Sequence, residues 1–169
     1  SLKQSEINTM LVDFVLDGKN VVRLKGGDVS VFARAAEEIT HAERFGISPN
    51  LIPGISSFTG IAAAHRIPLT RRCQYESIWI TTGYTCDRKP SEDIVQAAQS
   101  TATVVILMGM THLEEIMSIF KRHKPADYAV GIVQNGTLSN EKWITGTLST
   151  IVKQVMDCLL YTSPSPRDA

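Results

Sequence analysis

The sequence has few of the features that mark metal-binding, disulfide-bonded and membrane proteins. Its three cysteines, Cys73, Cys86 and Cys158, form no C-x-x-C pair, which argues against a structural zinc site, and an odd number makes no disulfide framework. This usage favours a reducing compartment. No apolar run reaches the roughly 18–20 residues of a membrane helix, and no signal peptide is visible. We expect a cytoplasmic protein, with a plastid as the alternative for a eukaryotic source.

Charge and nucleophile motifs are also scarce. The 17 basic and 17 acidic side chains give a net charge of zero, so the chain lacks the basic surface that nucleic-acid binding requires. The four histidines show no metal-ligand spacing, and the G-x-S-x-G and Walker patterns are absent. We therefore expect a ligand that is small or held by a few placed charges, and neither a metal nor nucleic acid.

Apolar periodicity predicts helices that alternate with strands. Helices are expected over residues 5–16, 31–45, 57–64, 91–98, 111–121 and 147–159. Strands are expected over residues 21–24, 51–52, 77–82, 103–108 and 128–133, with Trp143 in an edge strand or hairpin. This order predicts βαβ units and a mainly parallel sheet. We expect two α/β domains, residues 1–73 and 74–160, followed by a disordered and possibly foreign tail over residues 161–169.

Four polar or glycine-containing segments follow predicted strands: residues 25–28, 53–57, 108–110 and 134–137. Each alone fits an ordinary turn, helix start or packing residue. Open α/β sheets assemble ligand sites at the carboxyl ends of their strands, so together the segments predict one site. Asp28 could accept hydrogen bonds from a ribose hydroxyl or an ammonium group, or cap the next helix. The Arg71-Arg72 turn fits a solvated loop or the recognition of substrate carboxylates.

The order of these motifs resembles the tetrapyrrole methylase family, and within it the uroporphyrinogen-III C-methyltransferases. The resemblance runs from about Ser1 to Val155. It is carried by residues 3–8, 21–28, 31–34, 53–57, 67–70, 108–109 and 134–137.

The resemblance implies two α/β domains with the cofactor in the cleft between them, usually in a homodimer. It implies methyl transfer from S-adenosylmethionine to uroporphyrinogen III, giving precorrin-2 for sirohaem and cobalamin synthesis, without a metal. The implied cofactor contacts are Gly26, Gly27, Asp28, Val31, Ser56, Ser57, Met108, Gly131 and Gly136. Because the substrate carries many carboxylates, Arg34, Arg71 and Arg72 are its predicted partners.

The chain departs from the family pattern in two ways. Val29 stands where proline is usual, and Ala33 and Ala35 stand where glycines are usual. Alanine at a positive φ costs about 1 kcal/mol, so a lower cofactor affinity is expected. The family's first strands, which carry proposed acid–base residues, would lie upstream of Ser1, and its last strand is absent. We therefore expect a fragment that is inactive alone. Alternatives are a non-catalytic binding or dimerisation module, a methylase of another tetrapyrrole, and a generic nucleotide-binding α/β protein.

Overall fold

The computed structural model describes residues 2–85, 89 and 91–158, which form two compact units. The first unit is Ser1–Gly60 and the second is Ile61–Ala169. Helix α3 (Ser57–Ala64) runs across the division. The predicted boundary between domains lies further along the chain, after Cys73, and stays a prediction. The predicted tail, residues 161–169, lies outside the described residues.

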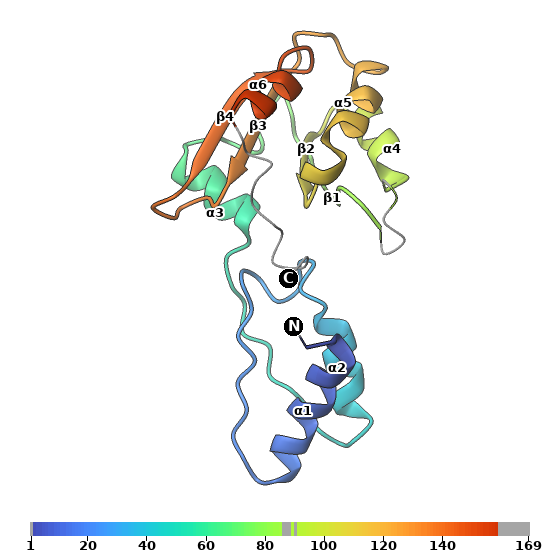
Figure 1. Cartoon of the computed structure of the whole chain (residues 1–169), viewed down its shortest axis with the longest axis vertical. Coiled ribbons are helices and arrows are strands. Elements are labelled where there is room, and N and C mark those ends of the chain that lie inside the picture. Colours follow the sequence, from blue (N-terminus) through green and yellow to red (C-terminus); the bar gives the residue numbers. More distant parts are fainter. Residues whose placement is uncertain (1, 86–88, 90, 159–169) are drawn as a thin grey trace. The chain divides into compact units, whose positions relative to one another are not determined.

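Two helices organise the first unit. Helix α1 (Gln4–Leu16) packs against α2 (Ala35–Glu43), with Val12 of α1 buried (Figure 1). Helix α1 begins one residue before the predicted start. Helix α2 is shorter than predicted, because residues 31–33 form bends and residues 44–46 form a turn.

The strands predicted at residues 21–24 and 51–52 were wrong. Among residues 2–60 the structure has no strand, and these segments run without ladder pairing. The apolar side chains of Val22, Leu24 and Ile52 are 80%, 81% and 78% exposed. A β-branched sequence favours extended backbone, but a strand needs a hydrogen-bonded neighbour, and neither segment has one.

The second unit combines a βαβ unit with a hairpin. Strands β1 (Ile78–Thr82) and β2 (Thr103–Leu107) are parallel, with α4 (Asp93–Gln99) as the crossover between them. A 3₁₀ turn (Met110–His112) then leads into α5 (Leu113–Lys121). The predicted βαβ unit is confirmed. The N-cap residue of α5 is His112, which makes no side-chain cap hydrogen bond.

Strands β3 (Ala129–Gln134) and β4 (Lys142–Thr147) are antiparallel, and Val133 pairs with Trp143. The hairpin predicted around Trp143 is confirmed, whereas the expected mainly parallel sheet is not. The connection over residues 135–141 is too short for a parallel crossover, which requires a dozen or more residues.

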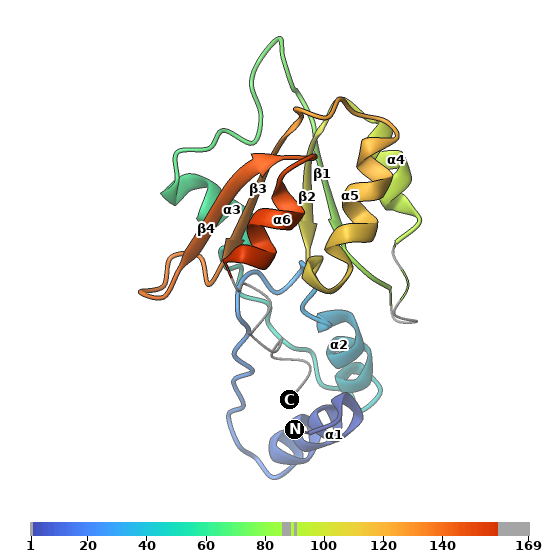
Figure 2. The same cartoon turned by 45° about the horizontal axis from the view of Figure 1, so that its top comes forward.

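One hydrophobic core joins both strand pairs of the second unit. Helix α6 (Ile151–Asp157) contacts β4, and α4 contacts α5 and β1 (Figure 2). The buried cluster comprises Ile94, Ala98, Leu113, Ile116, Met117, Phe120, Leu148, Ile151 and Val155. Among the helices that the structure describes, none is long and apolar enough to cross a membrane.

Ile151→Ala is expected to destabilise the second unit. Ile151 is fully buried in the core, and truncation of such a residue costs about 2–5 kcal/mol. Met156→Ala, on the same helix but 49% exposed, should change the free energy of unfolding by less than about 0.5 kcal/mol. Urea denaturation followed by tryptophan fluorescence measures both. Equal losses for the two variants would contradict this assignment of the core.

Candidate functional site

Two of the predicted site loops lie against each other in the first unit. The backbone N–H of Gly54 donates a hydrogen bond to Asp28 Oδ2 at 3.0 Å. A Cβ added at Gly54 would lie 2.6 Å from the carbonyl oxygen of Gly27, so only glycine allows this approach. Gly27 itself has φ 114°, a conformation that favours glycine. The two loops, whose residues Asp28 and Gly54 are 26 positions apart in the chain, are thus held together by one carboxylate and two glycines.

The Asp28 carboxylate is committed to the protein's own backbone. Its Oδ1 accepts hydrogen bonds from the backbone N–H of Ser30, at 2.8 Å, and from the Ser30 hydroxyl. Hydrogen bonds from the Ser30 side chain, the Gly54 backbone and the Ser30 backbone hold the pKa of Asp28 below its ordinary value. The carboxylate therefore stays ionised and fixes the shape of both loops.

The start of α3 continues this first part of the site. The backbone carbonyl of Ser56 accepts hydrogen bonds from the N–H groups of Thr59 and Gly60, at 3.1 and 2.9 Å. The residue itself is buried, while Ser57 is exposed. Val31 is half-buried, and its N–H lies 3.4 Å from the carbonyl oxygen of Asp28.

In the second unit, the carboxyl ends of the parallel strands converge. The N–H of Gly83, just after β1, donates to the carbonyl of Leu107 at 2.7 Å. A Cβ on Gly83 would collide with the backbone of Gly109. Met108 adopts φ 57° at this point, which is costly for a residue with a side chain. Sequence reasoning did not select Gly83, although a glycine directly after a buried strand is the signal that could have found it.

The loop between β3 and β4 contacts α3 and the residue that follows it. A Cβ on Gly136 would collide with the side chain of Ile61. Glu141 accepts a hydrogen bond from the Thr137 N–H at 2.5 Å and pairs with His65 Nε2 at 2.7 Å. Gly136 is therefore held in a fixed loop, at a strand end as predicted.

The predicted contact Gly131 lies elsewhere on the same hairpin. It occupies the middle of β3, opposite Thr145 on β4. A Cβ at this position would meet no atom within 4 Å. Its place is thus on the strand and not in the loop that follows.

Strain in residues 31–35 does not fall where the family pattern suggested. Phe32 and Arg34 have φ values of 51° and 56°, whereas Ala33 and Ala35 are not in the left-handed region. The expected cost of alanine at position 33 was therefore wrong. The left-handed residues are Phe32 and Arg34, on either side of Ala33.

The predicted substrate arginines have different environments. The Arg34 guanidinium binds Glu37 through two hydrogen bonds, at 2.8 and 2.6 Å, which raise the pKa of Arg34 and lower that of Glu37. Arg71 and Arg72 are exposed in a turn that Arg71 and Tyr75 close through their backbones. The two units thus carry these arginines separately.

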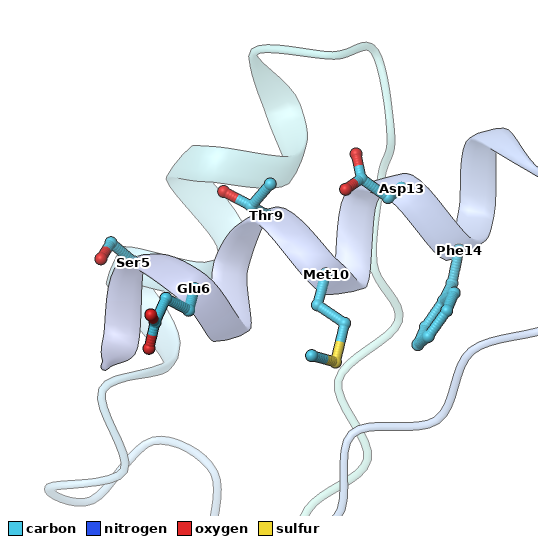
Figure 3. Close-up of a pocket in the computed structure, with 6 residues that line it drawn as sticks. All are labelled: Ser5, Glu6, Thr9, Met10, Asp13 and Phe14. Carbon is cyan, nitrogen blue, oxygen red and sulfur yellow. The ribbon is translucent and has the colours of Figure 1, made fainter. Parts of the chain in front are cut away.

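Two open hollows lie in the first unit. One lies along α1 and contains none of the predicted site residues (Figure 3). It is lined by Ser5, Glu6, Thr9, Met10, Asp13 and Phe14. The second adjoins the site and is lined by residues 29–30, 32–36, Ile39 and Leu51. Within the described part of the chain, no group of His, Cys, Asp and Glu side chains is arranged to hold a metal ion.

Gly54→Ala is expected to cost about 1–3 kcal/mol in the free energy of unfolding, because the added methyl group must displace the backbone at Gly27. Gly26→Ala is the matched control, since a Cβ there meets nothing within 4 Å. Urea denaturation followed by far-UV circular dichroism compares the two. Equal urea midpoints for the two variants would show that the close contact between Gly54 and Gly27 contributes nothing to stability.

The contribution of Asp28 to the free energy of unfolding should depend on pH. Its folded pKa lies below the ordinary value of 3.8, so the unfolded chain binds more protons in this range. The advantage of the wild type over Asp28→Asn is present above pH 3.8 and is lost as the pH falls through the folded pKa. Denaturation curves across this range measure it, with Asp13→Asn, on the exposed face of α1, as the control. An advantage that does not change with pH would refute the role of the carboxylate.

The sequence matches a known family along most of its length. Residues 1–152 match the family described as Tetrapyrrole (Corrin/Porphyrin) Methylases. The chain is 39% identical over 158 residues to the uroporphyrinogen-III C-methyltransferase of Methanocaldococcus jannaschii, covering 91% of this chain and 64% of that protein. It is also 39% identical over 155 residues to the siroheme synthase of Pseudomonas putida, covering 89% and 33%. The chain spans less than two thirds of either relative.

The fold agrees with the sequence match. The structure is similar, with a TM-score of 0.76 and 25% identity, to the uroporphyrin-III C-methyltransferase of Thermus thermophilus in complex with S-adenosylhomocysteine. This similarity covers 89% of the chain and 67% of that protein. The chain therefore belongs to the tetrapyrrole methylase family and has its mixed α/β fold.

Proposed function

We propose that this chain is part of an S-adenosylmethionine-dependent methyltransferase that converts uroporphyrinogen III to precorrin-2, for sirohaem and cobalamin synthesis. The observation that carries the proposal is the joined pair of loops around Gly27 and Gly54, held by Asp28. Both relatives named above support it, one as a methyltransferase of this substrate and the other as a siroheme synthase.

The residues in the first unit fit the cofactor's chemistry. A Cβ at Gly26 would meet no atom within 4 Å, so the backbone there is open to close approach by a ligand. Ser57 adds an exposed polar side chain in the second site segment, residues 53–57. We assign the cofactor contacts to Gly26, Gly27, Asp28, Val31, Ser56 and Ser57, and in the second unit to Met108, Gly131 and Gly136.

When bound, S-adenosylmethionine supplies an electrophilic methyl group to a nucleophilic ring carbon. The work of this chain's residues is alignment, because fixed loops remove the entropy cost of orientation. Asp28 contributes by holding its own loop and Gly54 in one geometry, and the Glu141–His65 pair does the same for Gly136. No residue of this chain is assigned to proton removal.

The carboxylates of the substrate would bind to cationic side chains. Arg71 and Arg72 are exposed and suit bidentate recognition of carboxylates. Arg34 already binds Glu37, so a substrate carboxylate would compete with that pair. We further propose a cytoplasmic homodimer, without nucleic-acid or membrane partners, whose domains divide near residues 73–74.

Isothermal titration of the chain with S-adenosylhomocysteine tests the cofactor assignment, with ATP and NAD as competitors. We expect binding that neither nucleotide displaces. Transfer of a labelled methyl group from S-adenosylmethionine to uroporphyrinogen III by the whole protein tests the reaction. Binding without transfer by the whole protein would favour a non-catalytic module.

Gly26→Ala should weaken cofactor binding while leaving stability intact. The methyl group enters open space that we assign to the ligand, and it touches no protein atom within 4 Å. We expect the dissociation constant for S-adenosylhomocysteine to rise about tenfold, which corresponds to about 1.4 kcal/mol. Glu43→Gln is the control, because Glu43 is exposed in the last turn of α2 and is assigned no contact with the cofactor; its dissociation constant should equal that of wild type. Unchanged affinity would remove Gly26 from the site.

A further inference from the structure

A largely buried ion pair lies at the base of the first site loop. Lys25 directly precedes Gly26, and its Nζ lies 2.5 Å from Glu38 Oε2 on α2. Both side chains are only 10% exposed. The sequence analysis included Lys25 in the segment of residues 25–28 without giving it a role, and it did not select Glu38, since a glutamate in a helix fits a solvated surface.

The Lys25 ammonium also closes the loop on itself. It donates a hydrogen bond to the carbonyl oxygen of Ala33 at 2.8 Å. One cation therefore joins the first residue of the segment to a residue eight positions later, with Gly26, Gly27 and Asp28 between them. Glu38 of α2 pairs with the same cation.

Glu38 is in turn fixed by its neighbours. Its Oε1 accepts hydrogen bonds from Gln4 Nε2 of α1 at 2.9 Å and from Arg23 Nε at 3.3 Å. Burial by itself raises the pKa of Glu38, but the hydrogen bonds from Lys25 and Gln4, with the charge of Lys25, outweigh it and leave the pKa lowered. The carboxylate is thus an ionised anchor that α1, α2 and the loop share.

We propose that Lys25 and Glu38 are positioning residues for the cofactor, acting as a clasp that holds residues 26–33 in the binding conformation. Neither is assigned a contact with the cofactor, because Lys25 Nζ binds the Ala33 carbonyl and the Glu38 carboxylate. The inference rests on the proposed function. The affinity for the cofactor should fall in proportion to the fraction of molecules in which residues 26–33 already have the binding conformation.

Three variants separate positioning from stability: Glu38→Gln, Lys25→Met, and the double variant that combines them. Glu38→Gln leaves the Lys25 charge without its partner, so both stability and affinity should fall. Lys25→Met with Glu38→Gln removes both charges, so the urea midpoint should recover toward wild type. The clasp is still absent in this double variant. We expect its dissociation constant for S-adenosylhomocysteine to stay about tenfold above wild type, as for a loop in place about one tenth of the time.

Glu43→Gln is the matched control, since it removes an exposed carboxylate from the last turn of the same helix. Its affinity and midpoint should equal those of wild type. A double variant that regains wild-type affinity together with its stability would overturn the proposal. So would a loss of affinity confined to Lys25→Met alone and absent in Glu38→Gln, which would indicate direct contact with the ligand.

Hydrogen exchange without ligand keeps the test independent of the proposed function. The backbone amides of residues 26–33 should exchange faster in Glu38→Gln and in the double variant, and unchanged in Glu43→Gln. If wild type binds no S-adenosylhomocysteine, the proposed function fails, and the exchange rates still decide whether the clasp orders the loop. Equal exchange in all four proteins would refute the clasp.

Discussion

The Asp28 carboxylate is the point on which the geometry of the first unit depends. It joins two loops that are 26 residues apart through the Gly54 N–H, and it shapes its own turn through Ser30. In most α/β proteins a ladder of backbone hydrogen bonds brings such loops together. Here the segments before both loops lack ladder pairing, so side-chain acceptors and two close-packed glycines hold the loops instead.

The two units are stabilised by different physical means. The second has a core in which Ile94, Leu148 and Ile151 are fully buried, so its stability comes mainly from apolar burial. In the described part of the first unit, Val12 is the one buried apolar side chain. Polar contacts that fix conformation therefore carry more of the organisation there, and a single lost acceptor affects several segments together.

The sequence predicted the second unit well and the first only in part. Period-2 and period-3.6 patterns located β1, β2 and α5 to within one or two residues, because the apolar faces they describe are packed into one core. The strands expected before Gly26 and Gly54 failed, since pairing depends on a neighbour that local pattern cannot supply. The hairpin at Trp143 was anticipated, while the antiparallel direction followed from the short connection.

Predictions of the site were limited in a related way. Glycines that follow predicted strands could be selected from the sequence, and Gly27, Gly54 and Gly136 do lie where added side chains would meet neighbouring atoms. The Lys25–Glu38 pair could not be found, because its burial results from the packing of α2 against the loop and not from any local motif.

The backbone of residues 31–35 bears on how this sequence relates to its family. The left-handed conformations belong to Phe32 and Arg34, and neither Ala33 nor Ala35 requires a glycine. An exchange of glycine for alanine at these two positions is therefore nearly neutral for the loop. The two alanines therefore add no backbone strain to the loop, and they are no sign of damage to its site.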